Sequence, residues 1–316
     1  MPARSIAVWT VRYATDAEGL FSRAEMGHGG MMAALTFPGP AQAMRSLLVR
    51  QVRAVFNDRS KGETPVVPSE QALFDPDSPI RVVHADVVAM MVGGMRALLL
   101  QMLHPAALQG VLDHSDFRED VEGRLRRTAR FIATTTYGHR DEAARAVARV
   151  NTIHSRVHGT LPDGTAYSAT DPRVLAWVHL AEAPSFLEAY LAYADPAMPG
   201  SAQDRYFAQS AVVAGMLGAA PVPRSRAEAA ALLGEMRGEL HGSPAAREVA
   251  AFLLEGGDGR RPGRISRTLG IAAVDLLPPF ARTMLRLHRP GIGGLPAIVG
   301  TRAMAGAVRW AFAGSR

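Results

Sequence analysis

The chain has 316 residues, 48% of them hydrophobic and 20% charged, a balance typical of a globular protein rather than a disordered one. It has no cysteine, which excludes disulfides, iron–sulfur clusters, cysteine-ligated zinc and haem held by a thiolate. The net charge of +6 fits an anionic ligand or an acidic partner.

No zinc-finger, basic-zipper or aromatic RNA-binding motif is present, so no nucleic-acid partner is expected. The first 19 residues are polar and charged where a signal peptide has an apolar core, which favours a cytoplasmic location. A homodimer is compatible with these data.

Residues 1–75 are broken by clusters of glycine and proline, which predicts an N-terminal arm with short helices around 17–26 and 41–56. Helical periodicity then begins, and a helix is predicted over 84–103. Its apolar run contains Gly93-Gly94 and Arg96, and His104-Pro105 follows. These interruptions favour a buried core helix over a transmembrane span.

Further helices are predicted over 117–138, which ends at Gly138, and over 141–158, which is followed by Gly159. Residues 159–170 contain Pro-Asp-Gly-Thr and predict a small hairpin. Later helix starts and breaks are marked by Asp171-Pro172, Ser225 with Glu228, Ser243-Pro244, 255–262, Leu277-Pro278 and 290–294. The sequence therefore predicts an all-α fold, with one helical domain over 76–316.

Arg124, Arg127 and Thr128 share one face of the 117–138 helix, because they are three and four residues apart. Two arginines and a hydroxyl at the edge of a core are suited to binding an anion or an oxygen ligand. The alternative is that these arginines form a solvent-exposed basic face that pairs with the acidic residues in the first turn of the same helix.

The 141–158 helix carries an apolar stripe, and His154 lies roughly 40° from the middle of that stripe, whereas His158 lies roughly 80° away. His154 is therefore expected to point into the core and His158 to lie at its edge. A buried imidazole needs a partner, either a metal or a backbone carbonyl. The stripe consists of Ala143, Val147, Val150, Ile153 and Val157.

Other metal sites fit less well. Read as a zinc-type HxxxH motif, His154 and His158 lack the catalytic glutamate, whose position is Ser155. A di-iron bundle needs paired Glu-x-x-His motifs, and the chain offers only the reversed His179 to Glu182. His104, His114 and His179 are interpreted as structural.

A set of short motifs resembles the domain shared by the latex-clearing rubber oxygenases and the MpaB oxygenases, catalogued as DUF2236. The resemblance covers about residues 75–315 and so takes in most of the chain. The motifs are Ser78–His84, Gly94–Gln101, Leu103–Pro105, His114–Arg118, Gly123–Thr128, Thr134–Gly138, Ile153–Val157, Asp163-Gly164, Trp177–His179, Ser185-Phe186, Pro221–Arg226 and Leu277–Phe280.

This resemblance implies a globin-like helical bundle that binds haem b, with its iron, through one proximal histidine, here His154. It also implies that Arg124 and Thr128 line the haem pocket. Arg127 stands where rubber oxygenases have a lysine. No glutamate stands between Gln71 and Arg118, where they have a glutamate base; the carboxylates there are Asp75, Asp77, Asp86, Asp113 and Asp116.

The leading hypothesis is a haem-dependent oxygenase or peroxygenase that acts on a small or lipid-like apolar substrate with dioxygen or peroxide. His154 would bind the iron, with His158 nearby, and Arg124, Arg127 and Thr128 would line the reactive face. One alternative is a haem- or lipid-binding protein without turnover, serving storage, transport or sensing. A second alternative is a protein that has the same fold but binds no haem, with His154 as an ordinary core residue.

Overall fold

The computed structural model describes residues 39–56, 63–115, 120–255 and 263–313. Within them the chain forms thirteen α-helices and one short hairpin, which confirms the all-α prediction. The helices are α1 Pro40–Phe56, α2 Pro79–Ala85, α3 Val87–Gln101, α4 Pro105–His114, α5 Val121–Tyr137, α6 Arg140–His154, α7 Pro172–Tyr193, α8 Gly200–Met216, α9 Arg226–Met236, α10 Pro244–Glu255, α11 Arg264–Leu276, α12 Pro279–Leu285 and α13 Leu295–Ala313. Two 3₁₀ turns are η2 Arg237–Glu239 and η3 Ile292–Gly294.

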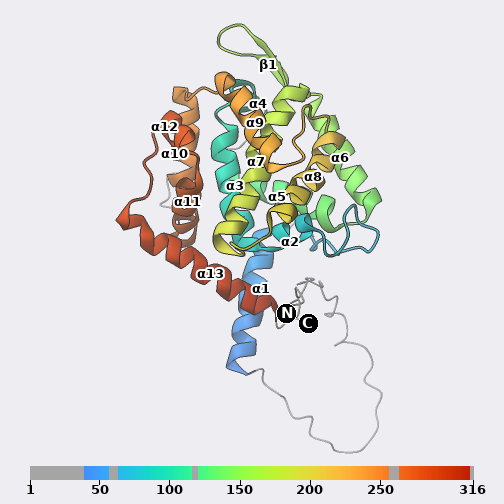
Figure 1. The fold of residues 1–316 in the computed structure, drawn as a ribbon, viewed down its shortest axis with the longest axis vertical. Coiled ribbons are helices and arrows are strands. Elements are labelled where there is room, and N and C mark those ends of the chain that lie inside the picture. Colours follow the sequence, from blue (N-terminus) through green and yellow to red (C-terminus); the bar gives the residue numbers. More distant parts are fainter. Residues whose placement is uncertain (1–38, 57–62, 116–119, 256–262, 314–316) are drawn as a thin grey trace, which may run out of the picture.

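Helices α3 and α7 form the centre of the fold and pack against each other along their lengths (Figure 1). Most of the buried side chains of these two helices are apolar, and Leu99 and Trp177 are among the most buried of the molecule. Helices α11 and α13 cover α3 on one side, and α8 and α9 cover α7 on the other. Burial of this apolar surface is the main force that holds the helices together.

The N-terminal helix α1 packs against α13 and α5. Its bounds agree with the helix predicted around 41–56, whereas the one predicted around 17–26 lies outside the described residues. The predicted hairpin is also present: β1 (His158–Thr160) pairs antiparallel with β2 (Ala166–Ser168) and projects from one end of the molecule (Figure 1).

The helix predicted over 84–103 is present as α3, but it begins at Val87, and residues 84–85 belong to the separate helix α2. The chain bends by 92° at Asp86, between α2 and α3. The carboxylate of Asp86 accepts a hydrogen bond from the amide of Ala89 and pairs with Arg309 of α13 at 2.7 Å. Asp86 thus caps a new helix, a role that the surrounding apolar run conceals.

The helix predicted over 141–158 ends four residues early, at His154, because residues 155–157 turn into β1. The apolar stripe also ends before expected, since Ala143 and Val147 are buried but Ile153 is 52% exposed. No single helix among the described residues has the length and hydropathy of a membrane span, although the bent pair α2–α3 meets the criterion jointly.

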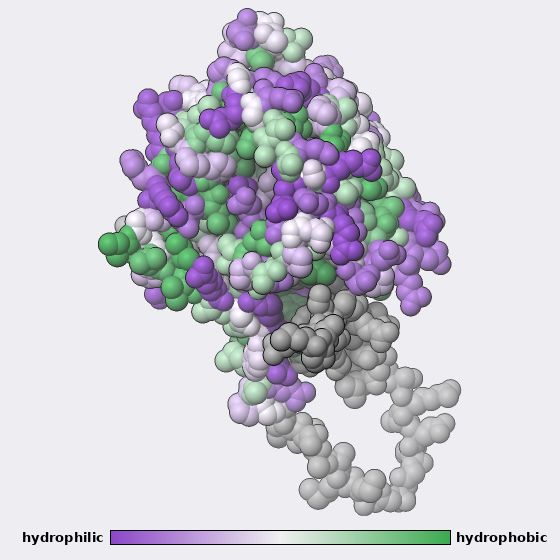
Figure 2. Space-filling view, viewed as in Figure 1, coloured by the Kyte–Doolittle hydropathy of each residue, from purple (hydrophilic) through white to green (hydrophobic). Residues whose placement is uncertain are grey.

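Figure 2 shows a mainly hydrophilic face, with hydrophobic side chains gathered at the corner where α13 begins. Ile292, Leu295 and Val299 are the exposed apolar residues of that corner.

Candidate functional site

The α5–α6 hairpin brings the two main candidate residues together. Asp120 caps α5 by accepting a hydrogen bond from the amide of Gly123, and α5 packs along α6. Because Arg124 lies in the first turn of α5 and His154 is the last residue of α6, the antiparallel packing places both at one end of the hairpin.

Arg124 points inward from this end. Its guanidinium Nη1 donates a hydrogen bond at 2.8 Å to the hydroxyl of Ser115, which donates in turn to the carbonyl of Val111. Burial lowers the pKa of Arg124, and the neighbouring charge of Arg127 lowers it further. Arginine stays protonated under these conditions, so Arg124 supplies a fixed positive charge next to α4.

His154 is half-buried, and its Nδ1 atom is buried without a hydrogen-bond partner among the described residues. Burial lowers the pKa of His154, and the positive charge of Arg124 adds to the effect. The imidazole is therefore neutral at pH 7, with a ring nitrogen not engaged by the protein. A neutral imidazole is the form that binds a metal.

The other predicted site residues lie at the surface. Thr128 and Arg127 are exposed, and Arg127 forms an ion pair at 3.0 Å with Asp120. His158 is exposed at the start of β1, where its backbone carbonyl accepts a hydrogen bond from His114. The structure thus places Arg124 and His154 together, and Arg127 belongs to the solvated basic face that the sequence left open.

A cavity of about 20 Å³ lies beside Arg124. Its other walls are apolar: Leu98, Met102, Val111, Leu125, Val249 and Leu253. Pockets for ligands of drug size span about 300–1,000 Å³. The neutral imidazole of His154 and the positive charge of Arg124 are groups that suit a haem. The cavity is far smaller than a porphyrin, however, and must widen to admit one.

The carboxylates that precede Arg118 are committed elsewhere or exposed. Asp86 pairs with Arg309, and Asp113 accepts a hydrogen bond from the hydroxyl of Tyr167 at 2.6 Å. Asp75 and Asp77 are exposed. Asp116 lies outside the described residues, and no cluster of three histidines or carboxylates suited to a metal ion occurs among those described.

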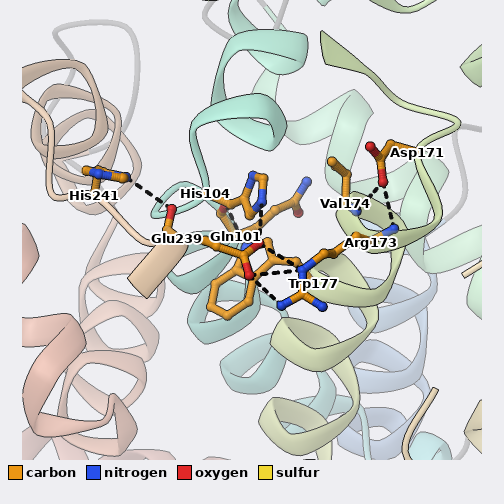
Figure 3. A network of polar contacts seen from close by, with 8 residues as sticks. All are labelled: Gln101, His104, Asp171, Arg173, Val174, Trp177, Glu239 and His241. Atoms are coloured by element: carbon orange, nitrogen blue, oxygen red, sulfur yellow. Dashed lines mark hydrogen bonds and ion pairs between the residues drawn. The ribbon is translucent and has the colours of Figure 1, made fainter. Parts of the chain in front are cut away.

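His104 belongs to a polar network at the ends of α3 and α7 (Figure 3). Arg173 donates to both carboxylate oxygens of Glu239, and His104 Nε2 lies 3.8 Å from that carboxylate. The indole of Trp177 donates to the carbonyl of Gln101 at 3.2 Å. Arg173 joins α7 to η2, Trp177 joins α7 to α3, and His104, at the start of α4, lies against η2, which agrees with the structural interpretation of His104.

A second polar cluster lies in the core between α2, α5, α7 and α8, and sequence reasoning missed it. His84 makes hydrogen-bond contacts with Thr136 at 2.9 Å through Nδ1 and with Tyr206 at 3.4 Å through Nε2. Burial lowers the pKa of His84 to about 3. Burial raises the pKa of Tyr206, and the charge of Glu182 contributes to that rise.

Glu182 and His179 stand one helical turn apart on α7. Burial raises the pKa of Glu182 to about 7 and lowers that of His179 to about 4, and His179 Nε2 is buried with no partner among the described residues. The signal in the sequence was a histidine and a glutamate within an otherwise apolar helix. The reversed order of these two residues predicts no di-iron site, and the sequence alone favours a structural role for His179.

Searches of curated proteins and of solved structures found no match to this chain. A family model described as the catalytic domain of the ER-bound oxygenases mpaB/B' and the rubber oxygenase matches residues 81–310, which include α3 to α12 and most of α13. The matched segment contains Arg124, His154 and both polar clusters. This chain therefore belongs to the mpaB and rubber oxygenase family and carries its oxygenase catalytic domain.

Proposed function

We propose that this oxygenase depends on haem b and acts on a small or lipid-like apolar substrate. The observation that carries the proposal is the imidazole of His154, which is neutral, half-buried and has its Nδ1 atom without a protein partner beside Arg124. When bound, haem would supply the iron at which dioxygen or peroxide is activated.

His154 would hold the iron through its imidazole. Arg124 would place a positive charge beside the ligand, where it stabilises negative charge on a haem propionate or on oxygen. The apolar walls of the neighbouring cavity exclude water and favour an apolar substrate. Thr128 and Arg127 are both exposed. They join this site only if α5 rotates about its axis or the cavity opens.

The test is reconstitution of the purified protein with haemin, followed by optical spectroscopy. We expect a Soret band and one haem per chain, and we expect His154→Ala to lose the bound haem. His158→Ala is the matched control, since His158 is exposed and lies outside α6, and it should keep its haem. Unchanged haem content in His154→Ala would contradict the assignment.

A haem-binding protein without turnover is the second candidate, and one observation favours it. Among the described residues, the charge that acts on His154 is that of Arg124, and no carboxylate contributes. Within the part of the chain that the structure describes, the glutamate base of the rubber oxygenases thus has no counterpart beside this histidine. Oxygen consumption by the reconstituted protein with apolar alkenes separates the two candidates.

A further inference from the structure

A second and larger cavity lies between α3, α7, α8, α9 and α12 and has a volume of about 270 Å³. Its walls are mostly apolar and include Leu100, Trp177, Leu180, Leu187, Phe207 and Leu233. A cavity of this size with few polar groups is suited to the hydrocarbon part of a small ligand.

The two cavities lie on opposite sides of α3. Arg96 and Leu100, one helical turn apart, line the larger cavity, whereas Leu98 and Met102 line the small cavity beside Arg124. A shift of two residues corresponds to a rotation of about 200° around a helix. The larger cavity is therefore separate from the site of His154.

Arg96 is an unusual lining residue of the larger cavity, because it is charged and yet only 4% exposed. Its Nε donates at 2.8 Å to the carbonyl of Leu276, the last residue of α11, and its Nη1 donates at 2.7 Å to the hydroxyl of Ser185. Its Nη2 has no partner among the described residues and is not among the fully enclosed unpartnered atoms.

The charge of Arg96 is not neutralised by an ion pair within the described residues. Glu188 also lines the cavity and acts on Arg96 electrostatically, but it is exposed and forms no ion pair with it. Arg226, the other arginine of the cavity, is paired at 3.0 Å with Asp204. The partial negative charge at the end of α11 offsets only part of the cost of burying Arg96.

We propose that this cavity binds an apolar carboxylic acid, with the carboxylate on Arg96 and the hydrocarbon chain against the walls supplied by α7, α8 and α9. The free Nη2 donor gives the carboxylate a charge-assisted hydrogen bond at the edge of a largely apolar cavity. The bound acid supplies the directly paired counter-charge that no described residue provides to Arg96.

The probe is octanoate, whose binding to the full-length protein is measured by isothermal titration calorimetry, with octan-1-ol as a neutral ligand of the same chain length. We expect octanoate to bind one per chain and at least about tenfold more tightly than octan-1-ol, a factor that corresponds to about 1.4 kcal/mol. Arg96→Gln should weaken octanoate binding and abolish the preference for the acid.

Three variants at exposed positions keep the test independent of the folding of Arg96→Gln. Ala230→Phe places a ring in the cavity and should weaken octanoate binding by about tenfold or more. Ala231→Phe, the matched control, changes the adjacent exposed residue, which does not line the cavity, and should bind normally. Glu188→Gln removes a negative charge near the carboxylate and should tighten binding about two- to threefold.

Three outcomes would overturn the proposal. The first is equal affinity for octanoate and octan-1-ol, which would show that Arg96 does not recognise the charge. The second is normal octanoate binding by Ala230→Phe, which would place the ligand elsewhere. The third is the absence of saturable binding below the concentration at which octanoate forms micelles.

Discussion

Glu182 is a carboxyl group held in the core without a hydrogen bond to any described residue. Burial raises its pKa from the usual 4.5 to about 7. An unfolded chain releases this proton at a lower pH than the folded one, so the free energy of unfolding decreases as the pH rises from 4.5 through 7. The ceiling of this loss is about 3 kcal/mol, at ~1.4 kcal/mol for each pH unit.

Glu182→Gln should therefore become more stable relative to the parent protein as the pH rises. Because Glu182 keeps some accessible surface, solvent screening reduces the effect, and we expect about 1–2 kcal/mol between pH 5 and pH 9, seen as a growing difference in Tm. Glu188→Gln changes an exposed glutamate of the same helix and is the control. A Tm difference for Glu182→Gln that stays constant with pH would contradict the assignment.

At the residue scale, the sequence predicts side chains on a regular helical face better than it predicts isolated polar groups in the core. His154 is predicted as a candidate because its neighbours repeat with helical period, although the buried part of that stripe ends before it, at Val147. Arg96 was noted only as an interruption of an apolar run, and Glu182 only within a reversed motif. Their significance depends on which helices surround them, and spacing along one chain does not contain that information.

At the scale of elements, the close crossing of α3 and α7 depends on Gly93. A Cβ atom added at Gly93 would lie 2.9 Å from both the Cα of Phe186 and the carbonyl oxygen of Ser185. Backbone atoms cannot move aside as the end of a side chain can. A Cβ atom at the neighbouring Gly94 would meet only the ring of Phe186, at 3.9 Å.

Gly93→Ala and Gly94→Ala are therefore a matched pair with opposite expected effects. Alanine favours a helix over glycine by about 1 kcal/mol, so Gly94→Ala should raise the free energy of unfolding by about 0.5–1 kcal/mol. Gly93→Ala gains the same helix propensity, but its Cβ atom forces α3 and α7 apart. We therefore expect its free energy of unfolding to fall by about 1–3 kcal/mol. Urea denaturation of both variants measures the difference, and equal stability of the two would refute the close crossing.

Element boundaries were predictable where a local signal marks them. Asp171-Pro172, Ser225 and Ser243 each begin a helix as expected, and Ser225 accepts a hydrogen bond from the amide of Glu228. The break at Asp86 was missed because its cap stands inside an apolar run and its partner Arg309 is 223 residues away. A long-range ion pair leaves no periodic signal in the sequence.

At the scale of the whole molecule, α3 separates two sites of different character. One side presents Arg124, with His154 nearby on α6, and the other presents the buried Arg96. Helix α7 crosses α3 and contributes Trp177 and Leu180 to the larger cavity only.

The division of the chain at residue 75 and its cytoplasmic location stay predictions.

This arrangement predicts that haemin and octanoate bind without competing. Because the two sites lie on opposite faces of a helix fixed by α7, α11 and α13, saturation with haemin should change the octanoate dissociation constant by less than about twofold. Ala230→Phe should lower octanoate affinity and leave haemin affinity unchanged, and His154→Ala should do the reverse. Displacement of octanoate by haemin would instead show that both ligands enter one site, and a loss of haemin binding in Ala230→Phe would place that site in the larger cavity.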